Sequence, residues 1–259
     1  MKTTSEISIV LVCTDCTNTR ILYHGVKEEI AFSHIITESP VTKKTLIKRR
    51  IKKQGWWTTF GQLIFQAGIV PLMRRLSAGK VNQILTTKRL STLPLPGDKI
   101  IHVASVNGEE FTNAIHAINP DLIIVNGTRI ISEKTLSKIN CPIINVHVGI
   151  TPLYRGVHGA YWALANNDRE HCGVTIHAID KGIDTGSIIA QDIIEPGKDD
   201  NFITYPYLQF EKAILLIRRV VPQIINNSYS FQKAPAGHSR LWYHPTVWQY
   251  LYNRFKGVK

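Results

Sequence analysis

The feature that most constrains the fold is a set of short runs of β-branched and aliphatic residues. They occupy residues 7–12, 100–103, 122–125 and 143–146. Runs of this length and composition are typical of strands that are buried on both faces of a parallel sheet. The stretches 108–118 and 132–139 between the later runs can form helices, and Ser132 can cap the second one. Strands that alternate with helices predict an α/β fold, with a mostly parallel sheet and helices on both faces.

The second half of the chain continues with less regular spacing. Residues 174–178 and 187–194 are expected to form two more strands, and residues 201–226 a helix whose regular part is limited by Pro206 and Pro222. Aromatic residues then crowd the tail, which we interpret as a surface that packs on the parent domain or on a second subunit. The sequence therefore predicts a main domain over residues 1–228 and a C-terminal aromatic tail over residues 229–259.

Composition narrows the classes of protein and partner. Hydrophobic residues make up 44% and charged residues 19% of the chain, which excludes an intrinsically disordered protein. Lys and Arg number 31 against 19 Asp and Glu, so the net charge of +12 favours an anionic partner: nucleic acid, a phosphate-bearing metabolite or an acidic membrane face. Four cysteines without a signal-peptide pattern at the start predict a cytoplasmic protein.

Two familiar kinds of site are not supported. Cys13 and Cys16 have redox-motif spacing, but Cys141 and Cys172 lack the paired spacing of further zinc ligands, so structural thiols and no metal site are expected. The loop after the first strand contains neither the glycine pattern of a dinucleotide site nor that of a P-loop.

A basic and aromatic segment follows the first part of the fold. Residues 43–53 carry seven positive charges, and an apolar stretch headed by Trp56 and Trp57 runs from there to Arg74 and Arg75. Polar residues and Pro71 interrupt the stretch, which is too short to span a membrane. We expect a helical insertion over about residues 42–78. It either contacts an anionic membrane peripherally or forms a surface helix pair with a solvated basic face. Nucleic acid is disfavoured because few aromatics lie among the charges.

Three polar residues near residues 145–184 suggest chemistry. Asn145 and His147 are two apart at the end of a predicted strand, so their side chains share a face, and the turn at residues 184–186 can bring Asp184 to the same point. An amide and an imidazole could supply donors to the negative charge that develops when an amine attacks a carbonyl. Asp184 could raise the pKa of His147 and accept the proton lost by the amine. On these residues alone, a histidine satisfied within the core remains the alternative.

At these positions the sequence resembles the folate-dependent formyltransferase family, which includes glycinamide ribonucleotide, methionyl-tRNA and sugar N-formyltransferases. The resemblance covers about residues 120–200 and rests on Asn145-x-His147 with Pro152 five positions on, then on residues 154–156, 173–175 and 184–186. It implies a Rossmann-like fold and catalysis by Asn145, His147 and Asp184. It also implies 10-formyltetrahydrofolate as the formyl donor, in a pterin pocket lined largely by backbone groups of Thr128, Arg129, Ile131, Ile179, Asp180 and Gly182.

Departures from the family pattern bear on the acceptor. Residues 148–151 differ from the usual loop, residues 14–19 are not a glycine-rich phosphate loop, and the roughly sixty residues after Glu195 are too few for the C-terminal barrel of a methionyl-tRNA enzyme. These differences favour an amino sugar carried on a nucleotide or lipid phosphate. Two alternatives stay open: hydrolysis of the same donor, and a non-catalytic protein that binds membrane or nucleic acid.

Overall fold

The computed structural model describes residues 7–259, and its centre is a mostly parallel sheet. The strand order is β3-β2-β1-β4-β5-β7-β8. The first five strands in this order run parallel to one another, whereas β7 pairs antiparallel with both β5 and β8. The predicted α/β class with a mostly parallel sheet is therefore confirmed. The strands are β1 Ile9–Cys13, β2 Phe32–Glu38, β3 Ile100–Val103, β4 Leu122–Asn126, β5 Ile143–His147, β7 Gly173–Ala178 and β8 Ile188–Ile193.

One strand of this sheet was not predicted. β2 lies beside β1, and its pattern is broken by Ser33 and His34 near its start. The side chains of Ser8 and Ser33 hydrogen-bond to each other at 2.9 Å, and Ser33 also donates to the Ile9 carbonyl. The hydroxyl of Ser33 is therefore satisfied within the sheet, so the strand tolerates it there, although a search for uninterrupted apolar runs overlooks the strand.

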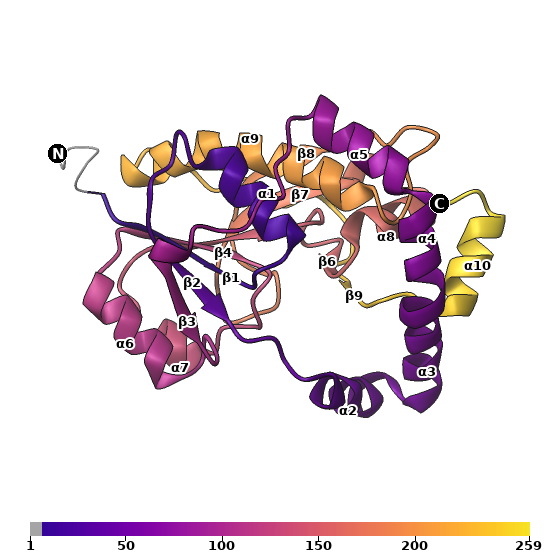
Figure 1. Cartoon of the computed structure of the whole chain (residues 1–259), viewed down its shortest axis with the longest axis horizontal. Helices are drawn as coiled ribbons and strands as arrows, with labels where there is room; N and C mark the ends of the chain where they lie inside the picture. Colours follow the sequence, from indigo (N-terminus) through magenta and orange to yellow (C-terminus); the bar gives the residue numbers. More distant parts are fainter. Residues whose placement is uncertain (1–6) are drawn as a thin grey trace.

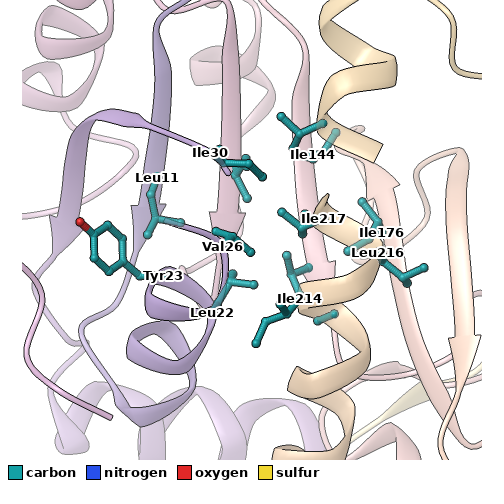
Figure 2. Packing of buried hydrophobic residues seen from close by; sticks show 14 of the residues in the cluster. Leu11, Leu22, Tyr23, Val26, Ile30, Ile144, Ile176, Ile214, Leu216 and Ile217 are labelled. Carbon is teal, nitrogen blue, oxygen red and sulfur yellow. The ribbon is translucent and has the colours of Figure 1, made fainter. Parts of the chain in front are cut away.

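Helices cover both faces of the sheet, as predicted (Figure 1). α1 (Thr17–Val26) and α9 (Tyr205–Ile225) pack on one face, and Figure 2 shows Leu22, Val26, Ile214 and Ile217 between them and the strands. α6 (Glu109–Ile118) and α7 (Glu133–Leu136) cover the other face. Ser132 caps α7 by accepting from the Thr135 amide, although that helix ends before residue 139. Short 3-10 turns lie at Gly97–Lys99 and Arg169–His171.

A chain of helices connects β2 to β3. It consists of α2 (Lys43–Gln54), α3 (Trp56–Ile64), a π-helical turn (Phe65–Ile69), α4 (Val70–Leu76) and α5 (Ala78–Thr87). Gly55 turns α2 into α3 with φ of 82°, a conformation that favours glycine. α2 buries none of its side chains, whereas the π-helical turn buries Phe65 completely. None of the helices within residues 7–259 is long and apolar enough to cross a bilayer.

The C-terminal segment packs on the rest of its own chain. β9 (Leu241–Trp242) pairs with β6 (Arg155–Gly156), and Trp242 stacks on Trp162 of α8 (Gly159–Ala165) at 4.7 Å between ring centroids. α10 (Val247–Phe255) places Tyr250 against Phe65. The aromatic tail therefore packs on the parent domain, which is one of the two partners expected for it. The boundary at residue 228 stays a prediction.

Candidate active site

A cavity of about 530 Å³ opens at the carboxyl edge of the parallel strands. Cys16 beyond β1, Asn126 at the end of β4 and His147 at the end of β5 all line it. This is the edge where α/β sheets place ligands, because loops diverge there from neighbouring strands. The edge of the sheet at which the sequence placed the site therefore contains a cavity.

Asn145, His147 and Asp184 converge on one wall of this cavity. Asn145 Nδ2 lies 3.5 Å from Asp184 Oδ1, and His147 Nδ1 lies 3.4 Å from Asp184 Oδ2. The Gly156 amide donates to Asp184 Oδ2 at 2.9 Å, which fixes the carboxylate from the opposite side. Asp184 has a left-handed φ of 51°, and a Cβ on the following Gly186 would overlap the Ala178 carbonyl. The tight turn at residues 184–186 thus sets the carboxylate into the site.

A fourth polar residue, His177, belongs to the same cluster and was not predicted from the sequence. It lies on β7 directly opposite Asn145. Its Nδ1 bonds to the Ala178 carbonyl at 2.8 Å and must donate there, so its Nε2 accepts from Asn145 Nδ2 at 3.1 Å. His177 Nε2 also lies 3.7 Å from Asp184 Oδ1. Its place in the predicted strand 174–178 is a signal that could have found it. His177 follows Thr175 by two residues, so the two side chains share a face of the strand, and both are buried.

His147 is a buried imidazole with one nitrogen already engaged. Its Nε2 bonds to the Tyr154 carbonyl at 2.8 Å and therefore carries a proton. Burial lowers the pKa of His147, and this outweighs the raising effect of Asp184. The raising effect of Asp184 that the sequence suggested is present, but the burial that outweighs it was not visible in the sequence. The neutral ring leaves Nδ1 as a lone pair beside the carboxylate.

Asp184 is ionised throughout the physiological range. Burial alone would raise its pKa, but the adjacent imidazoles of His177 and His147 and the donated Gly156 amide lower the pKa to about 2. The site thus combines a fixed negative charge with a neutral base whose lone pair faces it. Such a pair can take up a proton transiently, since the imidazolium that forms would lie next to a carboxylate.

A sequence profile described as formyl transferase matches residues 63–216, which is more than half of the chain. The chain belongs to the formyl transferase family. A methionyl-tRNA formyltransferase from Nitratiruptor sp. is 34% identical over 128 residues, covering 49% of this chain and 40% of that protein. The chain thus spans well under two thirds of the length of the curated relatives it matches.

Solved structures of formyltransferases share the fold of this chain. A sugar N-formyltransferase from Shewanella sp. FDAARGOS_354 has a TM-score of 0.56 at 15% identity, covering 90% of this chain and 76% of that one. An N-formyltransferase from Helicobacter canadensis, solved with folinic acid and dTDP-3-aminofucose, has a TM-score of 0.54 at 17% identity, covering 91% and 70%. At these identities the likeness establishes the architecture alone.

The residues predicted to hold the folate line the same cavity as the polar cluster. They come from the loop after β4 and from the loop before Asp184: Thr128, Arg129, Ile131, Ile179, Asp180 and Gly182. Their polar side chains are occupied within the protein. The Arg129 guanidinium contacts Glu38 at 2.6 Å and the Ser39 carbonyl, and Asp180 accepts from the Gly182 amide and the Thr185 hydroxyl. Apolar side chains beside two backbone loops fit a flat ring with polar edges.

A second cavity of about 720 Å³ adjoins the first. The π-helical turn, α4 and α5 form one wall, and the start of α1 and the start of α9 form the other. The two cavities share Cys16, Asn18, His158, Pro206 and His244. Arg74 lines the second cavity, and no carboxylate is among its lining residues. This space was not predicted from the sequence, because its lining residues come from five segments that are far apart in the chain.

Two histidines stand at the junction of the cavities. His158 Nε2 and His244 Nδ1 are 2.8 Å apart, one at the start of α8 and the other in the C-terminal segment. Burial lowers the pKa of His158 well below its usual value and that of His244 to about 4, helped in both cases by the charge of Arg50. At neutral pH the pair is therefore uncharged, and it forms a polar but neutral passage between the two spaces.

The cysteines are all free in the described residues. Cys13 is buried in β1, and burial raises the pKa of its thiol, which makes it a poor nucleophile. Cys16 is exposed and lines both cavities. Within residues 7–259, no group of three or more His, Cys, Asp or Glu side chains is placed to hold a metal ion.

Proposed function

We propose that this protein transfers a formyl group from 10-formyltetrahydrofolate to a primary amine on a phosphate-bearing acceptor, an amino sugar on a nucleotide or lipid phosphate. The observation that carries the proposal is the convergence of Asn145, His147 and Asp184 on the wall of the cavity that also contains the donor-pocket residues. The Helicobacter canadensis enzyme, which shares the fold, binds a folate and an amino-sugar nucleotide in one complex, and this supports both halves of the proposal.

The reaction needs a proton acceptor near the attacking nitrogen. In this reaction the bond between the formyl carbon and the folate nitrogen would break, with that folate nitrogen taking up a proton, and the formyl carbon would become bonded to the amine nitrogen. The amine nitrogen must then lose a proton, and His147 Nδ1 can take it directly or through one water. The resulting imidazolium would lie 3.4 Å from Asp184 Oδ2 and keep its Nε2 bond to Tyr154. Asp184 thereby stabilises the charged form without becoming protonated itself.

Asn145 is placed to meet the negative charge that develops on the formyl oxygen. One of its amide hydrogens is donated to His177 at 3.1 Å. The other faces Asp184 Oδ1 at 3.5 Å, a long contact that the amide can give up to a stronger acceptor. Since amide donors fixed before the reaction need no reorganisation, a single one is worth about 10²- to 10³-fold in rate.

The second cavity is proposed to receive the acceptor. It adjoins the polar cluster through His158 and His244, and Arg74 provides a positive charge within it. Because no carboxylate lines this space, a phosphate group meets attraction there without matching repulsion. Aromatic side chains of Phe65, Phe202 and Tyr207 give the rest of the wall the character of a sugar- or base-binding surface.

Formyl transfer to a panel of acceptors tests the proposal. The full chain would be incubated with 10-formyltetrahydrofolate and with amino-sugar nucleotides, an amino-sugar lipid phosphate and methionyl-tRNA. Folate product formation and the mass of each acceptor would be followed. We expect formylation of a phosphate-bearing amino sugar, and a fall of at least about 10²-fold in Asn145→Ala and Asp184→Asn.

Other results would contradict the proposal in distinct ways. Unchanged rates in both variants would remove the catalytic assignment. Formate release at the same rate without any acceptor would indicate a hydrolase instead. Formylation of methionyl-tRNA alone would keep the chemistry but replace the proposed acceptor.

A further inference from the structure

Two neighbouring helices present apolar stripes to solvent. On α10, Trp248, Leu251, Tyr252 and Phe255 follow helical spacing and are all exposed, up to 92% for Phe255. On α3, the exposed apolar residues are Trp56, Trp57, Phe60 and Ile64, with Trp56 67% exposed. Each helix also has a buried side, which includes Tyr250 on α10 and Gln62 on α3. The exposed stripes are therefore additional to the faces that anchor the helices to the fold.

The two stripes form one continuous surface. Trp57 of α3 stacks on Trp248 of α10 with ring centroids 5.0 Å apart. A Cβ on Gly61 would overlap the Trp248 ring, so the helices approach closely because a glycine faces the indole. Leu72 and Leu76 of α4 are exposed further along the same run of helices. Figure 1 shows α3 and α4 in line, one after the other, with α10 beside this column at one end of the molecule, away from α6 and α7.

A strongly basic helix borders this surface. α2 carries seven Lys and Arg residues, buries no side chain and contacts α3. Arg50 donates to Gln66 at 2.8 Å, and Gln62 donates to Gln54 at 2.9 Å, which ties α2 to the helices that carry the apolar stripe. The sequence has no acidic residue between Glu38 and Asp98, and none after Glu211. Positive charge on this end of the molecule is thus not balanced by carboxylates of the segments that build it.

We propose that this surface, made of α2, α3, α4 and α10, docks on an anionic lipid bilayer. Basic residues attract lipid phosphates at long range, and exposed tryptophans with leucines and Phe255 then insert at the headgroup boundary. A cationic helix beside an apolar stripe is typical of a segment that lies at a membrane interface. An anionic bilayer complements both parts, because its headgroups are negatively charged and its interior is apolar.

Other occupants fit these observations less well. In a second copy of this chain, the apolar stripe would bring another basic α2 towards the first, and their charges repel. Nucleic acid could meet the basic helix and stack on the exposed aromatic rings, but it would leave the exposed aliphatic residues Leu72, Leu76 and Leu251 without an apolar partner. Membrane docking is independent of the proposed acceptor, although it would bring the wall of the second cavity, which the π-helical turn and α4 help to form, close to lipid.

Vesicle binding tests the proposal on the full chain. Sedimentation would compare vesicles of phosphatidylglycerol and phosphatidylcholine with vesicles of phosphatidylcholine alone, over about 0.05 to 0.5 M salt. We expect binding to the anionic vesicles that weakens as salt rises, with a blue shift of tryptophan fluorescence. The triple variant Lys44→Glu, Lys48→Glu and Lys52→Glu should bind at least about tenfold more weakly.

A second triple variant provides the matched control. Lys134→Glu, Lys138→Glu and Lys233→Glu change the net charge equally at exposed residues outside the docking surface, and this variant should retain nearly all binding. Phe255→Ser with Trp56→Ser should weaken binding while leaving the basic helix intact. Circular dichroism checks that each variant folds.

Several results would overturn the proposal. One is the absence of any binding to anionic vesicles, and another is an equal loss of vesicle binding in the two lysine variants. Binding to RNA but not to vesicles, or a concentration-dependent dimer that buries Trp56, would also overturn it. None of these results depends on formyl transfer, so the failure of one proposal is distinguishable from the failure of the other.

Discussion

Asn145 and His177 face each other across β5 and β7, and their side chains are joined by a hydrogen bond of 3.1 Å from Nδ2 to Nε2. Because His177 Nδ1 donates to the Ala178 carbonyl, its Nε2 can only accept in the neutral ring. The amide of Asn145 is therefore oriented with its nitrogen towards Asp184 rather than its oxygen. The Ala178 carbonyl of β7 thus fixes the tautomer of His177, and His177 in turn fixes the rotation of the Asn145 amide.

Removing His177 should mainly affect turnover. In His177→Ala the Asn145 amide loses the bond that sets its rotation, and we expect kcat to fall by about 10²-fold with little change in KM for the donor. His177→Gln places a carbonyl oxygen near the lost acceptor position and should restore part of the rate. Steady-state kinetics of the three proteins checks this, and a similar rise in KM in both variants would contradict a positioning role.

Activity should depend on pH through His147. Burial lowers the pKa of this imidazole below its ordinary value of 6.5, so the neutral base is present at pH 7 and is lost as pH falls through the lowered pKa. Asp184 raises the pKa of His147, and its replacement in Asp184→Asn should move the acid limb of kcat/KM to lower pH while the plateau falls. A limb that moves to higher pH would show that the carboxylate does not act on this histidine.

Asp184 should also contribute to stability in a defined pH window. Its pKa in the folded chain is about 2, below the ordinary 3.8, so it stabilises the fold above about pH 4 and this contribution is lost as pH falls towards 2. The shift corresponds to about 2 kcal/mol. Asp184→Asn should lower the free energy of unfolding by roughly this amount at pH 7 and by less near pH 3, measured by urea denaturation. An equal loss at both pH values would contradict the linkage.

The repeating parts of this fold were predictable because local sequence determines them. Apolar runs placed β1, β3, β4 and β5, and the same argument placed Asn145 and His147 on one face at the right edge of the sheet. The D-T-G turn at Asp184 was predictable because it joins residues that are adjacent in sequence.

Features that depend on contacts between distant segments were not predictable. β9 pairs with β6 across more than eighty residues, and through this pairing the tail supports the strand whose Gly156 amide holds Asp184. The neutrality of His147 follows from its burial, which no local pattern reveals. Likewise, His244 reaches the junction of the two cavities only because the tail folds back on the domain.

Replacing Arg74 should weaken the binding of the acceptor and leave the binding of the folate donor unchanged. Arg74 lines the second cavity, whereas its neighbour Arg75 is exposed and outside that lining. Arg74→Ala should raise KM for a phosphate-bearing acceptor by about tenfold or more, because a charge-assisted hydrogen bond is worth about 1.5–3 kcal/mol. KM for the folate donor should not change, and Arg75→Ala should behave like the unmodified protein. Equal effects of the two substitutions would place the phosphate elsewhere.

Gly149 should prove necessary for the proton position on His147. A Cβ at this residue would overlap the Tyr154 carbonyl and would lie 2.7 Å from His147 Nε2. Gly149→Ala must therefore push apart the two groups whose hydrogen bond holds the Nε2 proton, at a cost of about 1–3 kcal/mol in unfolding free energy. We expect kcat to fall by about tenfold or more, because the ring loses the partner that keeps Nδ1 unprotonated.

Gly79→Ala in α5 is the matched control for Gly149→Ala. Nothing lies within 4 Å of its added Cβ, so it should leave kcat unchanged and stabilise the helix by up to about 1 kcal/mol. Nitrogen NMR of the imidazole reports the tautomer directly, and an Nε2-protonated His147 in a slow Gly149→Ala enzyme would show that the loss of rate has another cause.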